Sequence, residues 1–341
     1  MQPFFSTRIF KLLAIAALLL VEGCKSGGEP AASPQGAGRL QVVTTVAPIT
    51  SIVENVAGDR VQIAGIIPEG VNSHTFEPVP SDSKLLAKAD LIIFNGLDLE
   101  TPTLKLAKAN AKAGASIFFL GDKTVGKEDY VYDFSFPKEK GHPNPHLWLN
   151  PLYAMRYATL VRDELMRLDP KNKPAYEKNT TSFLKQLEAL DAAIKEAVET
   201  IPAGHRRLLT YHDSWPYFAR RYGFKVIGAA QPADFADPGP REMARLIEQI
   251  RAEKVPAVFG SEVFPSPILE QIAREGNSRY IDKLRDDELP GAPGEPRHSY
   301  VGMMLENMTI MVEALGGSAA PLKNVDPAPV AGSHADYRRT N

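Results

Sequence analysis

Short apolar runs rich in β-branched residues alternate with stretches of helical spacing along most of the chain. Strands that alternate with amphipathic helices favour a parallel sheet covered by helices. The pattern therefore predicts an α/β fold of two lobes, the first over residues 40–170 and the second over 202–317. The predicted strands are 40–45, 61–67, 91–94 and 116–120 in the first lobe and 207–211, 225–227, 257–260 and 280–282 in the second.

One helical pattern is much longer than the others. Between residues 171 and 201, apolar side chains recur at three- and four-residue steps, from Phe183 through Leu190 to Val198. Asp169-Pro170 separates this pattern from the preceding helix, because proline disfavours a helical conformation in the residue before it. A helix of about 28 residues spans about 42 Å at about 1.5 Å per residue. We expect it to join the two lobes as a single rigid linker.

The N-terminus has the form of a secretory leader. Arg8 and Lys11 precede an apolar run over 12–21 that is short for a membrane span and typical of a signal peptide. Cys24, the only cysteine, follows in a sequence that resembles a bacterial lipoprotein cleavage box. We expect residues 1–24 to be the signal peptide and Cys24 to carry a lipid anchor. An ordinary signal peptide with an incidental cysteine is the alternative.

Composition marks two further segments and excludes one class of partner. Residues 25–39 have the Gly, Ser, Pro and Ala content of a flexible tether. Residues 318–341 are polar and contain proline, which predicts a disordered tail. A formal net charge of -2 gives no reason to expect a nucleic-acid partner.

Three histidines lie in loops that could meet at one edge of the lobes. His74 follows a strand run, His146 lies in a proline-rich loop that opens a helix, and His212 stands where a strand meets a helix. Asp282 ends another strand run. Loops at the carboxyl ends of parallel strands are where α/β sheets bind ligands. Three imidazoles and a carboxylate form a complete set of ligands for a borderline divalent cation. His142, four residues before His146, competes with it, and the residues alone do not rank the two.

Other residues flank these positions. Glu262 follows an apolar strand run, and we expect it to hydrogen-bond near the metal rather than to bind it. Tyr211 and Trp148 are expected to pack around the ligands and shield them from water. A secreted zinc hydrolase is the rival class, with Glu262 as its base if Asp282 were not a ligand. Four protein ligands, however, close the position that a catalytic zinc keeps open for water, which favours binding over catalysis.

Several motifs, in order, resemble those of the metal-binding solute receptors of bacterial ABC importers for zinc, manganese and iron. The motifs are Val43-Thr-Thr45, Ala57-Gly-Asp59, the His74 loop with Pro80-Ser-Asp82, Asn95-Gly96, Pro145-His-Leu-Trp-Leu-Asn150, His212-Asp-Ser-Trp-Pro-Tyr-Phe218 and Val258-Phe-Gly-Ser-Glu262. The resemblance covers about residues 42–315. It implies two parallel-sheet lobes joined by one rigid helix, with the metal held between them by His74 and His146 from the first lobe and His212 and Asp282 from the second.

The resemblance also implies a metal and a cellular role. Histidine at the third ligand position, here His212, is usual in zinc-type receptors, whereas manganese-type receptors tend to have glutamate. Zinc is therefore the expected ion, with manganese or ferrous iron as the alternative, because the His-rich loop of many zinc-type relatives is missing from residues 121–141. Asn144 stands where an aspartate often precedes Pro-His. The expected role is that of an extracytoplasmic, monomeric receptor that is not an enzyme and delivers metal to an ABC permease and its ATPase.

Overall fold

The computed structural model describes residues 38–231, 237–261 and 266–339. The predicted signal peptide, Cys24, nearly all of the predicted tether and Glu262 lie outside these residues. Among the residues described, no helix combines the length and the apolar character that crossing a membrane requires.

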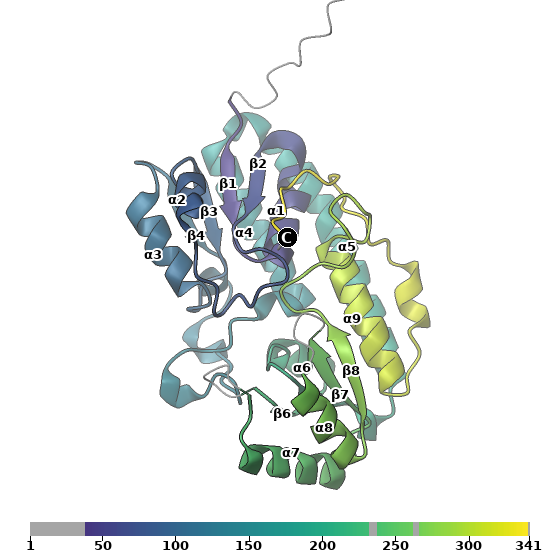
Figure 1. Cartoon of the computed structure of the whole chain (residues 1–341). Coiled ribbons are helices and arrows are strands. Elements are labelled where there is room, and N and C mark those ends of the chain that lie inside the picture. The colour runs from purple at the N-terminus through teal and green to yellow at the C-terminus, as the bar shows by residue number, and fades with distance from the viewer. Residues whose placement is uncertain (1–37, 232–236, 262–265, 340–341) are drawn as a thin grey trace, which may run out of the picture. The chain divides into compact units, whose positions relative to one another are not determined.

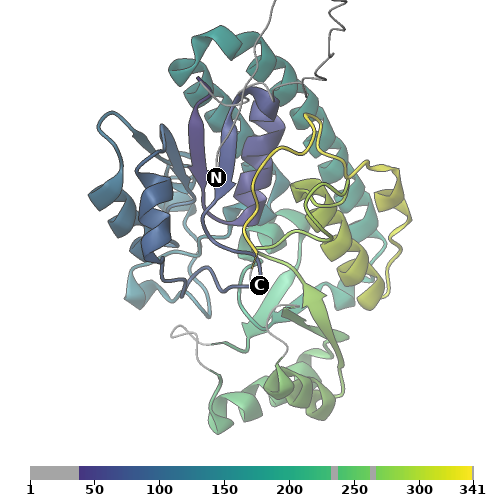
Figure 2. The ribbon, with the colours of Figure 1, turned by 45° about the horizontal axis from the view of Figure 1, so that its top comes forward.

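The first lobe contains a four-stranded parallel sheet with the strand order β2-β1-β3-β4. All four side chains of β3 are buried, as expected for an interior strand of a sheet covered on both faces. Figures 1 and 2 show α2 and α3 on one side of this sheet and α1 on the other. The elements are β1 (Gln41–Thr44), α1 (Ala47–Ala57), β2 (Gln62–Gly65), α2 (Pro80–Leu86), β3 (Leu91–Phe94), α3 (Thr101–Asn110), β4 (Ser116–Phe119) and α4 (Pro151–Leu168).

The second lobe repeats this arrangement. Its parallel sheet has the order β6-β5-β7-β8, so the first, second, third and fourth strands of each lobe occupy the same places. The elements are β5 (Arg207–Thr210), α6 (Pro216–Tyr222), β6 (Lys225–Ala229), α7 (Pro240–Glu253), β7 (Ala257–Ser261), α8 (Pro267–Gly276), β8 (Arg279–Leu284) and α9 (Tyr300–Ala314). The predicted fold class of two parallel-sheet α/β lobes is confirmed.

The long helix α5 (Lys173–Glu199) extends over 27 residues and packs on elements of both lobes. It contacts α1 and α4 of the first lobe and α9 of the second (Figure 1). Its apolar stripe, which includes Phe183, Leu187 and Ile194, is fully buried. On its polar side, Asp191 binds Arg221 of α6 through an ion pair. A continuous helix anchored in this way on both sides is the rigid linker that the sequence predicts.

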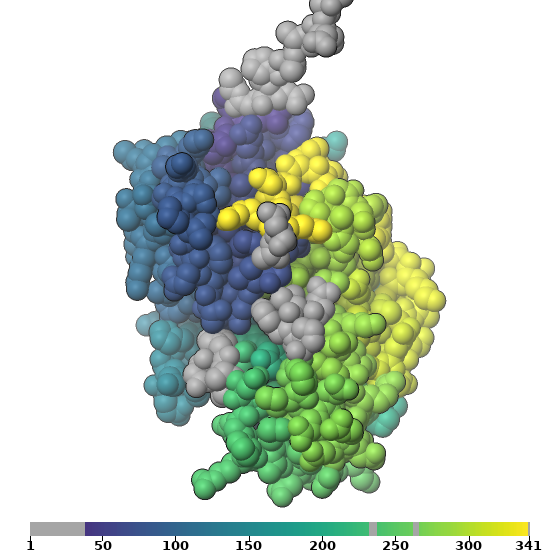
Figure 3. Space-filling view, viewed as in Figure 1, coloured from purple at the N-terminus to yellow at the C-terminus, as the bar shows by residue number. Residues whose placement is uncertain are grey.

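The C-terminal segment corrects one expectation. Residues 318–339 are ordered against the rest of the chain rather than disordered. A 3₁₀ helix (Ala320–Asn324) packs on α5, and Tyr337 is 8% exposed. Farther along, Asp336 pairs with Ala64 of β2, and Figure 3 shows the end of the segment, in yellow, lying on first-lobe residues. The composition misled because the few apolar side chains of the segment, among them Leu322, Val325 and Tyr337, enter the hydrophobic core, and polar partners far away in sequence hold its backbone.

Candidate metal centre

His74 is carried by the loop that connects β2 to α2. The loop leaves the carboxyl end of β2, where a parallel sheet offers unpaired backbone and room for ligand-binding side chains. The backbone N–H of His74 donates to Oδ1 of Asn72, 2.9 Å away. This local turn fixes the backbone at His74.

His146 is oriented by a neighbour two residues earlier in the chain. Oδ1 of Asn144 accepts hydrogen bonds from the backbone N–H of His146, at 3.0 Å, and from its ring Nδ1, at 2.9 Å. Because Nδ1 then carries the proton, Nε2 is left as the ligand atom. The asparagine therefore makes the contact expected of the aspartate that often occupies this place, and His146 is fully buried.

His212 completes a group of three imidazoles. It lies in the loop after β5, and one ring nitrogen from each of His74, His146 and His212 falls within 4.8 Å of the others. Nε2 of His74 and Nε2 of His146 are 3.2 Å apart. Two nitrogens bound to one tetrahedral zinc lie about 3.3 Å apart when each Zn–N bond is about 2.0–2.1 Å. His74 and His146 thus have the spacing of two ligands of one ion, and a ring nitrogen of His212 lies close enough to join them with a small adjustment.

The structure does not bring Asp282 to these histidines. Asp282 lies inside β8, which continues to Leu284, so the loop that leaves the carboxyl end of the strand begins only after it. Two other carboxylates, Asp286 and Asp287, lie in that loop. Asp286 borders the same small pocket as His212. Among the described residues, neither Asp282 nor the two loop carboxylates belongs to the group that the three histidines form, and the carboxylate ligand stays a prediction.

Asp287, the second of these carboxylates, is bound to the loop that carries His74. Its side chain accepts a hydrogen bond from Ser73, the residue before His74. Its other oxygen, Oδ1, is buried and has no hydrogen-bond partner among the described residues. A buried carboxylate oxygen without a partner is costly unless a cation or a proton satisfies it. Asp287 therefore has a buried oxygen that a cation or a proton would stabilise, and Ser73 links its side chain to the His74 loop.

Burial sets the protonation of the whole cluster. It lowers the pKa of His74 and His146 well below 6.5, and the neighbouring His212 lowers both further. It also lowers the pKa of His212, although the charge of Asp286 acts in the opposite direction. Burial raises the pKa of Asp287 well above 3.8, and Asp286 adds to the shift. The imidazoles are thus neutral donors ready for a cation, whereas burial makes the carboxyl group of Asp287 easier to protonate than an exposed aspartate.

Two aromatic residues pack against the histidines: Trp148, which was expected from the sequence, and Phe136, which was not. Trp148 packs its ring 5.1 Å from that of His146, and its Nε1–H donates to the backbone carbonyl of Asp286 at 2.7 Å. Phe136, which sequence reasoning missed, lies 5.5–5.9 Å from all three imidazole rings. Its place in an irregular loop gave no periodic signal. Tyr211 borders the same small pocket as His212, and its hydroxyl donates to Oδ1 of Asp237 at 3.4 Å.

A carboxyl pair that the sequence analysis missed connects the His146 and His212 loops. Nδ2 of Asn144 donates to Oδ2 of Asp133, at 2.7 Å, and to the backbone carbonyl of Asp213. Burial raises the pKa of Asp133 to about 6 and that of Asp213, which faces it, well above its usual value. Each of the two carboxyl groups therefore takes up a proton more readily than an exposed aspartate, because burial and the neighbouring carboxylate both disfavour its charged form.

His142 lies apart from the cluster. Its side chain is exposed and its Nδ1 lies 2.8 Å from Oδ2 of Asp98, which is exposed as well. The structure thus separates the two histidines that the residues alone did not rank. It places His146 with the other two imidazoles and leaves His142 at the surface.

Comparisons with known proteins identify a family. The profile of the ZnuA family, described as zinc-uptake complex component A, periplasmic, matches residues 42–314. The metal ABC transporter substrate-binding lipoprotein FimA of Streptococcus parasanguinis is 31% identical over 307 residues, which cover 89% of this chain and 96% of FimA. The manganese ABC transporter substrate-binding lipoprotein PsaA of Streptococcus pneumoniae is 30% identical, with 89% and 96% covered.

Solved structures show the same fold. The periplasmic zinc-binding protein TroA from Treponema pallidum superposes with a TM-score of 0.73 at 28% identity, over 82% of this chain and 99% of TroA. A manganese-bound periplasmic metal-binding protein from Candidatus Liberibacter asiaticus gives a TM-score of 0.71 at 26% identity, over 81% of this chain and all of that one. The relatives named here include both zinc-binding and manganese-binding proteins.

Proposed function

The chain belongs to the ZnuA family of metal-binding receptors of ABC importers, and from this membership we propose that it captures zinc and delivers it to a membrane permease. The family assignment makes the protein an extracytoplasmic substrate-binding receptor for a metal, and not an enzyme. The choice of zinc, the ligand set and the manner of anchoring are the proposed parts.

The main support for zinc is the arrangement of the three imidazoles. His74, His146 and His212 offer three neutral nitrogens within reach of one ion. Imidazole suits borderline ions such as zinc, whereas the harder manganese ion prefers carboxylate, carbonyl and water oxygens. Manganese remains the second candidate, since several relatives are named for it and two carboxylates lie beside the histidines.

We propose that His74, His146, His212 and Asp287 hold the ion. Asp287 replaces Asp282 in this set, because its buried Oδ1 lacks a hydrogen-bond partner and its other oxygen is bound to Ser73 beside His74. Trp148 would keep the loop of Asp286 and Asp287 against His146 through its hydrogen bond. Such outer contacts orient metal ligands and add to affinity.

The membrane arrangement follows from the family and the leader together. A permease and its ATPase are the partners that a substrate-binding component of an ABC importer requires. We propose that a lipid on Cys24 anchors the chain and that it acts as a monomer. The leader and the lone cysteine of the sequence support the anchor.

Metal titration of the purified, metal-free protein tests the function. We expect one tightly bound zinc ion per chain and weaker binding of manganese, measured by competition with a chelator of known affinity. His146→Ala should abolish tight binding, whereas the matched change His142→Ala, at the exposed histidine, should leave it intact. Tighter binding of manganese than of zinc would overturn the zinc assignment. Loss of binding in His142→Ala but not in His146→Ala would overturn the site.

Zinc affinity should fall as the pH is lowered, and the carboxyl group should govern the fall. The pKa of each histidine is already below 6.5, so few imidazole protons must leave at neutral pH. The pKa of Asp287 is raised, so its proton must be displaced. Zinc affinity therefore reaches its full value only at pH values above the raised pKa of Asp287, and it declines as the pH falls through that pKa.

Calorimetric titrations in buffers of different ionisation enthalpy count the protons released when zinc binds. At pH values below the raised pKa of Asp287, we expect proton release in the wild type and a flatter pH dependence of affinity in Asp287→Asn. The opposite result is a loss centred near the usual imidazole pKa of about 6.5 and unchanged in the variant. It would show that the histidines, not Asp287, control retention.

A further inference from the structure

The C-terminal segment of residues 325–339, here called the strap, runs from the second lobe onto the first. It follows the 3₁₀ helix Ala320–Asn324 after α9 and lies beyond the residues that the family profile matches, which end at 314. Figure 3 shows its yellow end resting on first-lobe residues. The strap therefore lies outside the part of the chain that the family profile describes.

The strap extends the free edge of the first sheet. β2 is an edge strand, and Asp336 pairs with it through two backbone bonds, N–H to the carbonyl of Ile63 at 2.9 Å and carbonyl to the N–H of Gly65 at 3.0 Å. Beyond the strand, the carbonyl of Arg338 accepts from the N–H of Glu69 at 2.9 Å. Pairing of this kind satisfies an exposed sheet edge. Here it also continues into the loop that carries His74.

A buried carboxylate holds the strap in this register. Glu54 of α1 is fully buried and accepts hydrogen bonds from the backbone N–H groups of His334 and Ala335 and from the hydroxyl of Tyr337. Hydrogen bonds to a charged acceptor are about twice as strong as neutral ones. The ring of Tyr337 also packs 4.6 Å from that of the buried His298. The residue after Tyr337 is thus delivered to a defined place.

That residue, Arg338, joins the two ends of the His74 loop. Its Nη1 donates to the carbonyl of Ile66, the first residue after β2, at 2.7 Å, and to Oδ1 of Asp82, in the first turn of α2, at 2.6 Å. Oδ2 of Asp82 accepts in turn from the N–H of Val79 at 2.8 Å. His74 lies between these ends, so one guanidinium group closes the base of its loop.

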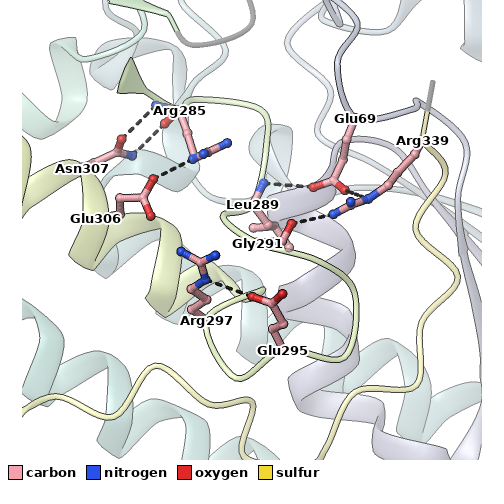
Figure 4. Close-up of polar contacts among 9 residues, drawn as sticks. All are labelled: Glu69, Arg285, Leu289, Gly291, Glu295, Arg297, Glu306, Asn307 and Arg339. Atoms are coloured by element: carbon pink, nitrogen blue, oxygen red, sulfur yellow. Dashed lines mark hydrogen bonds and ion pairs between the residues drawn. The ribbon is translucent and has the colours of Figure 1, made fainter. Parts of the chain in front are cut away.

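The other side of the loop is held by the second lobe. Arg339 of the strap lies 3.3 Å from Oε2 of Glu69 and donates to the carbonyl of Gly291 at 2.6 Å. Oε1 of Glu69 accepts from the N–H of Leu289 at 3.1 Å (Figure 4). Leu289 and Gly291 follow Asp287 in the same loop. The strap and the Asp287 loop therefore both bind to the His74 loop.

We propose that Arg338 is a positioning residue for the metal centre: by clasping both ends of the His74 loop it keeps His74 in its ligand position and slows release of the ion. The inference rests on the proposed role of His74 as a ligand. Fixing the ends of a loop reduces the conformations it can sample. A ligand that is held in place before the ion arrives binds it more tightly, because less ordering accompanies binding.

Two substitutions at Arg338 test the clasp in the full mature protein. Arg338→Ala removes both bonds, and Arg338→Lys keeps the charge but lacks the planar fork. In the metal-free state, hydrogen exchange should accelerate about tenfold at the amides of residues 66–79 in Arg338→Ala. Zinc dissociation, followed by trapping the ion with excess chelator, should accelerate by a similar factor, with Arg338→Lys between Arg338→Ala and the wild type.

Arg297→Ala is the matched control. Arg297 makes an exposed ion pair with Glu295, at 3.0 Å, in the same region (Figure 4). It should change neither loop exchange nor zinc dissociation. Unchanged exchange at 66–79 in Arg338→Ala, or faster exchange without faster dissociation, would overturn the clasp. His74→Ala, measured in parallel, separates this result from a failure of the ligand set: if that variant also retains zinc, His74 is not a ligand.

Discussion

Replacing Asp287 with asparagine will weaken zinc binding by about a hundredfold or more, whereas replacing Asp282 with asparagine will leave it nearly unchanged. Loss of a residue that only supports a metal ligand costs about 10–100-fold in affinity, so loss of a ligand should reach at least the upper end of that range. Asp287 has a buried oxygen without a hydrogen-bond partner among the described residues, and Ser73 holds its other oxygen beside His74. Asp282 lies within β8 instead.

The two variants form a matched pair. Each replaces a carboxyl group with an amide of nearly the same size, and both positions lie in or just after the same strand. Chelator competition gives the zinc dissociation constant of each, and thermal unfolding of the metal-free proteins shows whether either variant is misfolded. The metal-free Asp287→Asn protein should be at least as stable as the wild type, since it no longer buries a titratable carboxyl group. Equal losses of affinity in both variants, or a larger loss in Asp282→Asn, would refute the revised ligand set.

The fold could be predicted because its signals are periodic and local. Alternating apolar runs and helical spacings are strong over most of the chain, and the stripe of Phe183, Leu187 and Ile194 is long enough to specify α5. The three histidines could be predicted for a related reason. Each follows or opens a regular element, so its place at the edge of a lobe follows from topology.

The proposed carboxylate, Asp287, was not predicted from the sequence, because it lies beyond the strand end that the pattern indicates. The pattern placed the end of the last strand at Asp282, but β8 continues to Leu284 through the charged Lys283. Element boundaries are the weakest part of such reasoning, by two to four residues in general. An error of this size moved the loop past Asp282 and hid Asp286 and Asp287. The strap was missed for a different reason, since Arg338 and Glu54 find partners far away in sequence.

Changing His212 to glutamate will shift the selectivity of the receptor from zinc toward manganese. The proposed set of three neutral nitrogens and one carboxylate would become two nitrogens and two carboxylates. Oxygen donors favour the harder manganese ion, while zinc gains most from imidazole nitrogen. We expect the ratio of zinc affinity to manganese affinity to fall by about tenfold or more. Asp286, whose charge already acts on His212, would repel the new carboxylate in the metal-free protein.

That repulsion makes it necessary to distinguish a change in metal selectivity from a general loss of affinity. It should raise the pKa of the new glutamate, so that both ions bind more weakly at low pH, whereas the ratio of their affinities is set by ligand type. His142→Glu is the control, because it adds the same charge four residues from His146 at an exposed position outside the cluster. Competition titrations of both ions should give the wild-type ratio in His142→Glu and a reduced ratio in His212→Glu. Equal weakening of zinc and manganese in His212→Glu would mean that donor chemistry at this position does not set the metal preference.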